Sequence, residues 1–257
     1  IVLDTIKLLE VEYQIVSQEI RTSKVSAVIF KNQNQTLDSV VMPSVLGWGA
    51  SCTANPQRFV GGYVYVEPRE SDVIVGDIIK KHRMATSITA RHIFVYFSGI
   101  PEGEFSVVRW NLVVSSEDSL EVLCEPDVTA LAVSKDHNER IYRSRISGKR
   151  AVEQNIRGGT VIDTKIVEFT VDFAFYFVAR ASPGTAKTPK YSLIADNSQI
   201  PLDAIEGLTY GLCYLHAIVS STVAIPIPLV VADRCAKRGH NVYAANLKKT
   251  FRGLEKI

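Results

Sequence analysis

Four short stretches of the chain are apolar almost without interruption. They read HIFVYFSG (92–99), VTALAVSK (128–135), FAFYFVAR (173–180) and the shorter YSLIAD (191–196). A strand covered on both faces of a sheet has this continuous pattern, whereas a half-exposed strand alternates between apolar and polar residues. The four stretches therefore predict four buried strands.

Other segments predict the elements around these strands. PSVLGWGAS (43–51) and FVGGYVYVE (59–67) carry β-branched and aromatic residues bounded by Gly and Asn, which is typical of two neighbouring strands. Residues 25–30 are a further strand candidate, and residues 72–83 predict a helix with a basic end. Between positions 201 and 220, apolar residues recur at intervals of three and four, as on one face of a helix: Leu202, Ile205, Leu208, Leu212, Leu215 and Val219. Strands that alternate with helices in this way predict a mixed or parallel sheet with helices on both sides.

Composition sets limits on the partners of this fold. The chain has 257 residues, of which 46% are hydrophobic and 22% charged, as in an ordinary α/β protein with a sizeable core. The net charge is only +2, so any attraction to a polyanion must come from local clusters of Lys and Arg. The chain does not begin with Met, and we expect it to be part of a longer protein.

Cysteine usage and hydropathy exclude several classes of protein. The four cysteines are scattered without a CxxC pair, which argues against a zinc site or a disulfide framework and favours a reducing compartment. No apolar stretch approaches the roughly 18 residues that cross a bilayer. No charged region precedes an apolar run at the N-terminus, so we expect neither a membrane partner nor a signal peptide.

Common enzyme signatures do not occur in the chain. There is no GxxxxGK[ST] loop, no GxSxG elbow and no HExxH pair. His92 and His216 have apolar neighbours, which favours packed histidines over ligands. These features alone indicate only a folded α/β domain.

The segment VVADRCAKRGHN (230–241) is more informative. An apolar run ends at Asp233, and Arg234, Lys237, Arg238 and His240 follow within a few residues. One carboxylate with a group of cations about one helical turn beyond it requires an explanation, and the order of motifs along the chain offers one.

Five motifs occur in a fixed order: YFSGIPEGEF (96–105), GGTVIDTKI (158–166), SPGTAKTPKY (182–191), LTYGLCY (208–214) and AIPIPLVVAD (224–233). Together they resemble the Piwi domain of Argonaute proteins over roughly residues 43–245. The forms PSVLGWGAS, YVEPRE and ADRCAKRGHN are most similar to the worm-specific branch that uses secondary small RNAs. The resemblance implies an α/β fold over residues 43–257, a ribonuclease H-like mixed sheet with helices on both faces.

The resemblance also implies a domain boundary. EYQIVSQEI (12–20) and NQTLDSVV (34–41) resemble the end of the Mid domain, so residues 1–42 are expected to be the C-terminal part of a Rossmann-like Mid domain. The family's first Piwi strand would lie directly ahead of PSVLGWGAS. Because Met42 runs straight into Pro43, we expect this strand to be missing, which would leave an unpaired or differently paired sheet edge.

Target cleavage in the family needs four acidic or histidine side chains that hold two Mg²⁺ ions. Two metals stabilise the attacking and leaving oxygens of the displacement, and Mg²⁺ prefers carboxylate and water oxygens. By resemblance, the first acid would be lost with the missing strand, and the second would fall near Glu70 or Asp72. Ser98 stands at the third position and Asp233 at the fourth. Asp233 is therefore expected to be a remnant, and the chain is expected not to be an active enzyme and to have no metal site.

Residues that would hold the guide RNA are also assigned by resemblance. Arg is suited to phosphate because its guanidinium group is permanently charged and binds oxygens in a bidentate manner. The expected contacts to the guide 5′ phosphate are Lys7, Gln18 and Arg238, and those to the guide backbone are Lys135, Arg140, Thr185 and Lys187. Asp136 replaces a cation between Lys135 and Arg140, so this patch is expected to be weaker than is usual in the family. The family's stacking Tyr would fall near Leu3.

Three functions are open at this point. The first is guide small-RNA binding and RNA-directed silencing without target cleavage, with target RNA recognised by base pairing and silencing effector proteins recruited. The alternative is a Mg²⁺-dependent guide-directed endoribonuclease whose missing acids lie outside this sequence, and the third is a protein-interaction scaffold without RNA. No cofactor is expected. Mg²⁺ is expected only if the chain is an endoribonuclease, or at the guide 5′ phosphate. The expected location is the cytoplasm, with the nucleus as an additional site.

Overall fold

The structure is a computed structural model that describes residues 13–21, 44–51, 58–66, 84, 92–100, 102–106, 127–137, 139, 141, 148–163, 174–178, 187–216 and 222–254. Eight strands lie in this part of the chain: β1 (Tyr13–Arg21), β2 (Ser44–Ser51), β3 (Phe59–Val66), β4 (His92–Ser98), β5 (Asp127–Ser134), β6 (Thr160–Ile162), β7 (Ala174–Val178) and β8 (Lys190–Asp196). The helices are η1 (Glu102–Glu104), α5 (Ala151–Gln154), α6 (Leu202–Tyr214) and α7 (Ile227–Leu254).

All eight strands form one mixed sheet in the order β3-β2-β1-β4-β5-β8-β7-β6. The strand β1 is antiparallel to β2 and parallel to β4, and β4 is parallel to β5. The strands β6, β7 and β8 pair antiparallel and complete the sheet beside β5. The predicted mixed sheet is confirmed, and six predicted strands coincide with β2, β3, β4, β5, β7 and β8 to within about two residues.

β1 lies at the place in the sheet where the sequence predicts a missing strand. It belongs to residues 1–42, the segment that resembles the end of the Mid domain. In the structure β1 lies between β2 and β4 and hydrogen-bonds to both. The sheet is therefore continuous at this place, because a segment from residues 1–42 supplies the strand. For the remainder of residues 1–42, which lies outside the described residues, the Mid-domain assignment stays a prediction.

The central strands are buried on both faces, as their sequences predict. In β4, Phe94 and Tyr96 belong to one core, while Ile93, Val95 and Phe97 belong to the core on the opposite face. This division follows from the alternation of side chains along a strand. A continuous apolar run is therefore required wherever a strand separates two cores.

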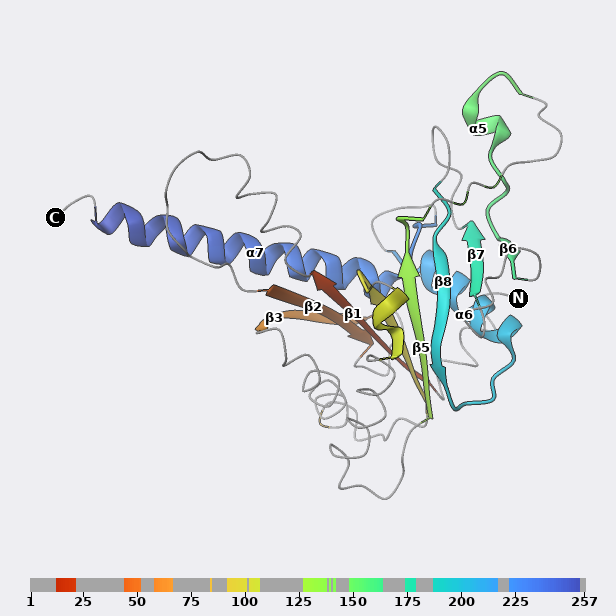
Figure 1. Cartoon of the computed structure of the whole chain (residues 1–257), viewed down its shortest axis with the longest axis horizontal. Coiled ribbons are helices and arrows are strands. Elements are labelled where there is room, and N and C mark those ends of the chain that lie inside the picture. Colours follow the sequence, from red (N-terminus) through yellow and green to blue (C-terminus); the bar gives the residue numbers. More distant parts are fainter. Residues whose placement is uncertain are drawn as a thin grey trace.

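Two helices cover the face that carries Phe94 and Tyr96. The apolar stripe of α6 contributes Ile205, Leu208 and Leu212 to this core, and the first turn of α7 contributes Leu229. The predicted helix after residue 201 is confirmed, although it ends at Tyr214. Figure 1 shows α7 as a long helix that crosses β1, β2 and β3 and continues past the sheet.

Glycines on β2 let α7 approach the sheet closely. A Cβ on Gly47 would lie 2.6 Å from the Ala236 nitrogen and 2.8 Å from the Ala236 Cβ. At Gly49 it would lie 2.6 Å from the Pro228 carbonyl oxygen. Real Cβ atoms do not occupy such positions. The glycines of β2 and the small residues of α7 therefore together determine the distance between the helix and the sheet.

Several predicted elements lie outside the described residues, including the strand candidate at 25–30 and the helix at 72–83. On the sheet face away from α6 and α7, the described residues that pack against the core include Ile100 and Phe105, which follow β4. In the part of the chain that the structure describes, no helix is both long and apolar enough to cross a membrane.

Candidate functional site

Ser98 ends the central strand β4. Its Cα partners are Val133 on β5 and Glu19 on β1, and Gly99 follows with a φ of 85° that favours glycine. Val133 belongs to the core under α6 and α7, so Ser98 lies on the helix-covered face at the carboxyl end of the strand. The position suits a ligand site, but the hydroxyl of Ser98 supplies no charge.

The register of β1 reveals an acid that the sequence did not point to. Glu19 is the Cα partner of both Ser98 and Gly47. A carboxylate residue thus occupies the strand position beside Ser98. No local pattern indicates this neighbour, because the pairing joins segments that lie far apart in the chain.

Asp233 lies on α7, and its carboxylate forms an ion pair with Lys237 one helical turn further on. The side chain of Asp233 is 24% exposed and that of Lys237 is 55% exposed. Ala232 and Ala236, which directly precede Asp233 and Lys237 in the chain, are buried. The predicted remnant acid is therefore half-buried and already has a cation as partner.

Arg238 and Arg234 lie on α7 beside this ion pair, and both are exposed. Arg234 donates a hydrogen bond of 3.4 Å to Nε2 of His216. Burial raises the pKa of the Cys235 thiol, and the charge of Arg238 acts in the opposite direction. The exposed side of this part of α7 is therefore cationic, as the sequence indicates.

Gln18 lies on β1, at a position whose Cα partners are Trp48 and Phe97, and Arg238 lies on α7. The 5′-phosphate pocket that Gln18 and Arg238 are expected to share stays a prediction. Lys7, the third predicted contact, lies outside the described residues.

Two of the predicted guide-backbone residues lie at the same end of the sheet. Lys135 follows the last residue of β5, and Lys187 precedes β8 by three residues; both are exposed. The two segments meet because Ser134 pairs with Lys190 and because a ring nitrogen of His137 contacts the carbonyl oxygen of Thr188. The structure thus gathers Lys135 and Lys187, while Arg140, Thr185, Glu70 and Asp72 lie outside the described residues.

A pocket of about 320 Å³ opens beside this end of the sheet. Its charged groups form two pairs, Lys190 with Glu102 at 2.9 Å and His137 with Glu139 at 2.7 Å. Burial would raise the pKa of Glu139, but hydrogen bonding to the backbone and to His137 lowers it overall. The exposed Asp136 also lines the pocket, so acids are more numerous than cations here, in keeping with the weak patch expected beside Lys135.

The sequence only partly indicated these pocket residues. His137 and Glu139 belong to the charged stretch SKDHNER, whereas Lys190 is a single cation ahead of an apolar run. Nothing in the local pattern shows that Lys190 is buried with only 4% of its surface exposed. His92 and His216 are both buried, so the prediction of packed histidines is confirmed.

The described donors around Ser98 do not fit a pair of Mg²⁺ ions. Hard divalent cations require several converging oxygens, most of them carboxylates. Of the four positions that the Piwi resemblance assigns, Ser98 is neutral and Asp233 is paired with Lys237. Glu19 is a third residue in the neighbourhood, placed by its backbone register alone.

Comparisons with known proteins agree with this fold. The family model described as Piwi domain matches residues 28–244. "Argonaute protein wago-1" from Caenorhabditis elegans is 32% identical over 78% of this chain and 22% of the relative, so the chain spans about a fifth of that protein. This likeness is in keeping with the worm branch expected from the sequence.

Solved structures show the same architecture. The C-terminal lobe of a budding yeast Argonaute has a TM-score of 0.78 at 18% identity, covering 97% of this chain and 52% of that one. Kluyveromyces polysporus Argonaute with a guide RNA has a TM-score of 0.73 at 19% identity, covering 92% and 28%. At these identities the likeness concerns the fold, which is ribonuclease H-like as expected.

Proposed function

Because the chain belongs to the Argonaute family through its Piwi domain, we propose that it binds a small guide RNA and silences complementary RNA without cutting it. The solved relative from Kluyveromyces polysporus carries a guide RNA on the same fold, which supports an RNA ligand. In this proposal the guide selects target RNA by base pairing, and silencing effector proteins act on the captured target.

The proposed absence of cleavage rests on the two assigned catalytic positions, Ser98 and Asp233. Ser98 contributes no charge, and the carboxylate of Asp233 is neutralised by Lys237. Two divalent cations a few ångströms apart repel each other strongly, and several carboxylates must converge to offset that repulsion. Among the described side chains, this donor set is too small and too weakly charged for the task.

The basic residues support guide binding. Lys135 and Lys187 lie together at one end of the sheet, and Arg238 lies on the exposed side of α7. Contacts of Lys and Arg with phosphates provide affinity that does not depend on the base sequence, which leaves selection to the guide. Lys7, Gln18, Arg140 and Thr185 are proposed as further contacts.

Two further features belong to the proposal. No cofactor is required, and Mg²⁺ would be used only at the guide 5′ phosphate. The protein acts in the cytoplasm and additionally in the nucleus. The four cysteines without a CxxC pair favour such a reducing compartment.

The register of Glu19 favours a second candidate function, guide-directed cleavage. Glu19 supplies a carboxylate residue beside Ser98, and further acids near Glu70 and Asp72 would have to complete the site. If cleavage occurs, Glu19→Gln should abolish it and leave guide binding intact. This candidate is weaker because Lys237 would have to release Asp233 before a metal could bind.

Recovery of small RNA from the protein purified out of its own cells tests the main proposal. Arg238→Glu should lower RNA recovery by roughly 10- to 150-fold, because a hydrogen bond to a charged group contributes about 1.5–3 kcal/mol. The exposed Arg157, which precedes β6, offers a matched control, and Arg157→Glu should retain the RNA. Equal recovery from all three proteins would contradict the assignment of Arg238, and the absence of small RNA from the parent protein would contradict guide binding.

A further inference from the structure

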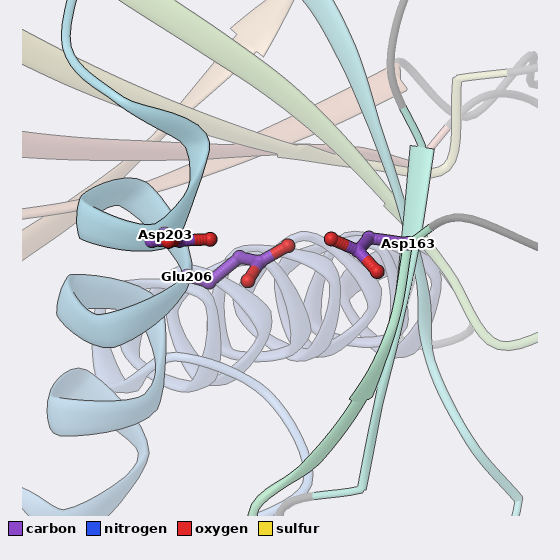
Figure 2. Close-up of side chains that lie close together, drawn as sticks. All are labelled: Asp163, Asp203 and Glu206. Carbon is purple, nitrogen blue, oxygen red and sulfur yellow. The ribbon is translucent and has the colours of Figure 1, made fainter.

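Three carboxylates converge outside the site described above. Asp163 follows the end of β6, and Asp203 and Glu206 lie on the first two turns of α6. Each offers an oxygen, and these oxygens all lie within 4.8 Å of one another. Figure 2 shows the Glu206 carboxylate between the two aspartates and directed toward Asp163.

Glu206 differs from an ordinary surface acid. Only 8% of its surface is exposed, and its Oε1 atom has no hydrogen-bond partner. A buried polar atom without a partner is unusual, since desolvation of such a group is costly unless something else compensates it. A positively charged atom bound to this oxygen, on the side that faces Asp163, would provide that compensation.

Among the described side chains, the cluster has no positive group that balances its negative charge. Among the side chains that the structure describes, no Lys, Arg or His forms an ion pair with the three acids. Like charges at this separation repel, and a shared cation would turn the repulsion into attraction.

The segment that carries Asp163 also comes close to α6 at a second place. Gly159 has a φ of 87°, and a Cβ there would lie 3.1 Å from the Tyr210 hydroxyl. Tyr210 lies one turn beyond Glu206 on α6. The chain from residue 159 to residue 163 therefore runs alongside the helix and brings Asp163 to its first turns.

We propose that Asp163, Asp203 and Glu206 bind one hard divalent cation, Ca²⁺ or Mg²⁺, which fastens the end of β6 to the first turns of α6. Carboxylate oxygens are the protein ligands that both ions prefer. Oxygens on opposite sides of the ion lie about 4.6–5.2 Å apart for Ca²⁺ and about 4.0–4.2 Å apart for Mg²⁺, so the cluster accommodates either. This cation site is separate from Ser98 and Asp233 and does not depend on the proposed function.

Thermal unfolding of the purified full chain tests the site. After removal of metals with EDTA, addition of 10 mM CaCl₂ or MgCl₂ should raise Tm by roughly 3–10 °C, as expected for a ligand with a dissociation constant near 0.1–1 mM. The salt that produces the larger rise identifies the ion. Tb³⁺ should also give a saturable luminescence on excitation of tyrosine, because Tyr210 lies next to the cluster on α6.

Two variants and a control decide the assignment. Glu206→Gln should be at least as stable as the parent in EDTA, because a buried charge is removed, and it should lose the response to cations. Asp163→Asn should lose the response as well. Asp136→Asn, which changes an exposed acid in the loop after β5, should keep it. The proposal is overturned if the parent shows no rise in Tm and no saturable Tb³⁺ signal, or if Glu206→Gln and Asp163→Asn respond as the parent does.

Discussion

Replacement of Gly47 by Ala tests how α7 is held on the sheet. The added Cβ would lie 2.6 Å from the Ala236 nitrogen, 2.8 Å from the Ala236 Cβ and closer still to the Ala232 carbonyl oxygen. Two of these three atoms belong to the backbone of α7, so no side chain can rotate away to make room. The helix itself would have to move.

The cost of this movement can be worked from the contacts. Insertion of a methyl group into a packed interior costs typically about 1–3 kcal/mol, and a rigid helix backbone places Gly47→Ala near the upper end, at about 2–3 kcal/mol. For a chain of this size, each kcal/mol lowers Tm by roughly 2–4 °C, so Tm should fall by roughly 4–12 °C.

Circular dichroism at 222 nm during heating of the purified chain measures the change. Gly207 provides the matched control, since it lies inside α6 and a Cβ there would meet nothing within 4 Å. Gly207→Ala should raise the stability by about 0.5–1 kcal/mol, because alanine is the better helix former. An unchanged or raised Tm for Gly47→Ala would refute the close approach of α7 to β2.

Three further predictions concern pH, salt and catalysis. Burial lowers the pKa of His92, so the folded chain holds the ring neutral. Stability should therefore be lost as pH falls through about 6.5, where the unfolded chain gains the proton. Denaturant titrations at pH 5 and pH 7.5 should show this loss of stability, and His92→Gln should reduce it. Guide affinity should fall with salt, and Lys187→Gln or Arg238→Gln should each make the slope of log K against log[salt] shallower by about 0.7, as filter binding at several salt concentrations can measure. Ser98→Asp alone should give no cleavage of a paired target, because Lys237 still neutralises the remaining acid on α7; cut product from this variant on a gel would contradict that view.

The buried strands were predictable because burial on both faces leaves a local signature. HIFVYFSG coincides with β4, and its odd and even residues divide between the two cores. The helix α6 was predictable for the same reason, since its apolar stripe has a period that matches a helix packed on one side.

The strand β1 could not be placed from its own sequence. β1 pairs with β2 and β4, which lie in distant segments of the chain. A local sequence pattern does not predict which strands become neighbours in a sheet. The relation between Glu19 and Ser98 was missed for this reason.

The helix α7 and the acid cluster were missed for different reasons. The stripe of α7 that faces the sheet includes Ala232, Ala236 and Gly239, whose small side chains give little hydrophobic signal. The cluster joins Asp163 to two acids on α6, and only the folded chain brings these segments together. The exposed cations were easier to predict, because a charged side chain at the surface needs no partner.

We propose that this Argonaute-family chain holds a guide and its target without cutting the target. The most direct measurement loads the purified protein with a synthetic guide, adds a labelled and fully paired target with Mg²⁺ or Mn²⁺, and follows both retention and length of the target. We predict that the target is retained on the protein at full length in both metals. A metal-dependent cut opposite the guide that Asp233→Ala abolishes would contradict the account and establish the endoribonuclease instead.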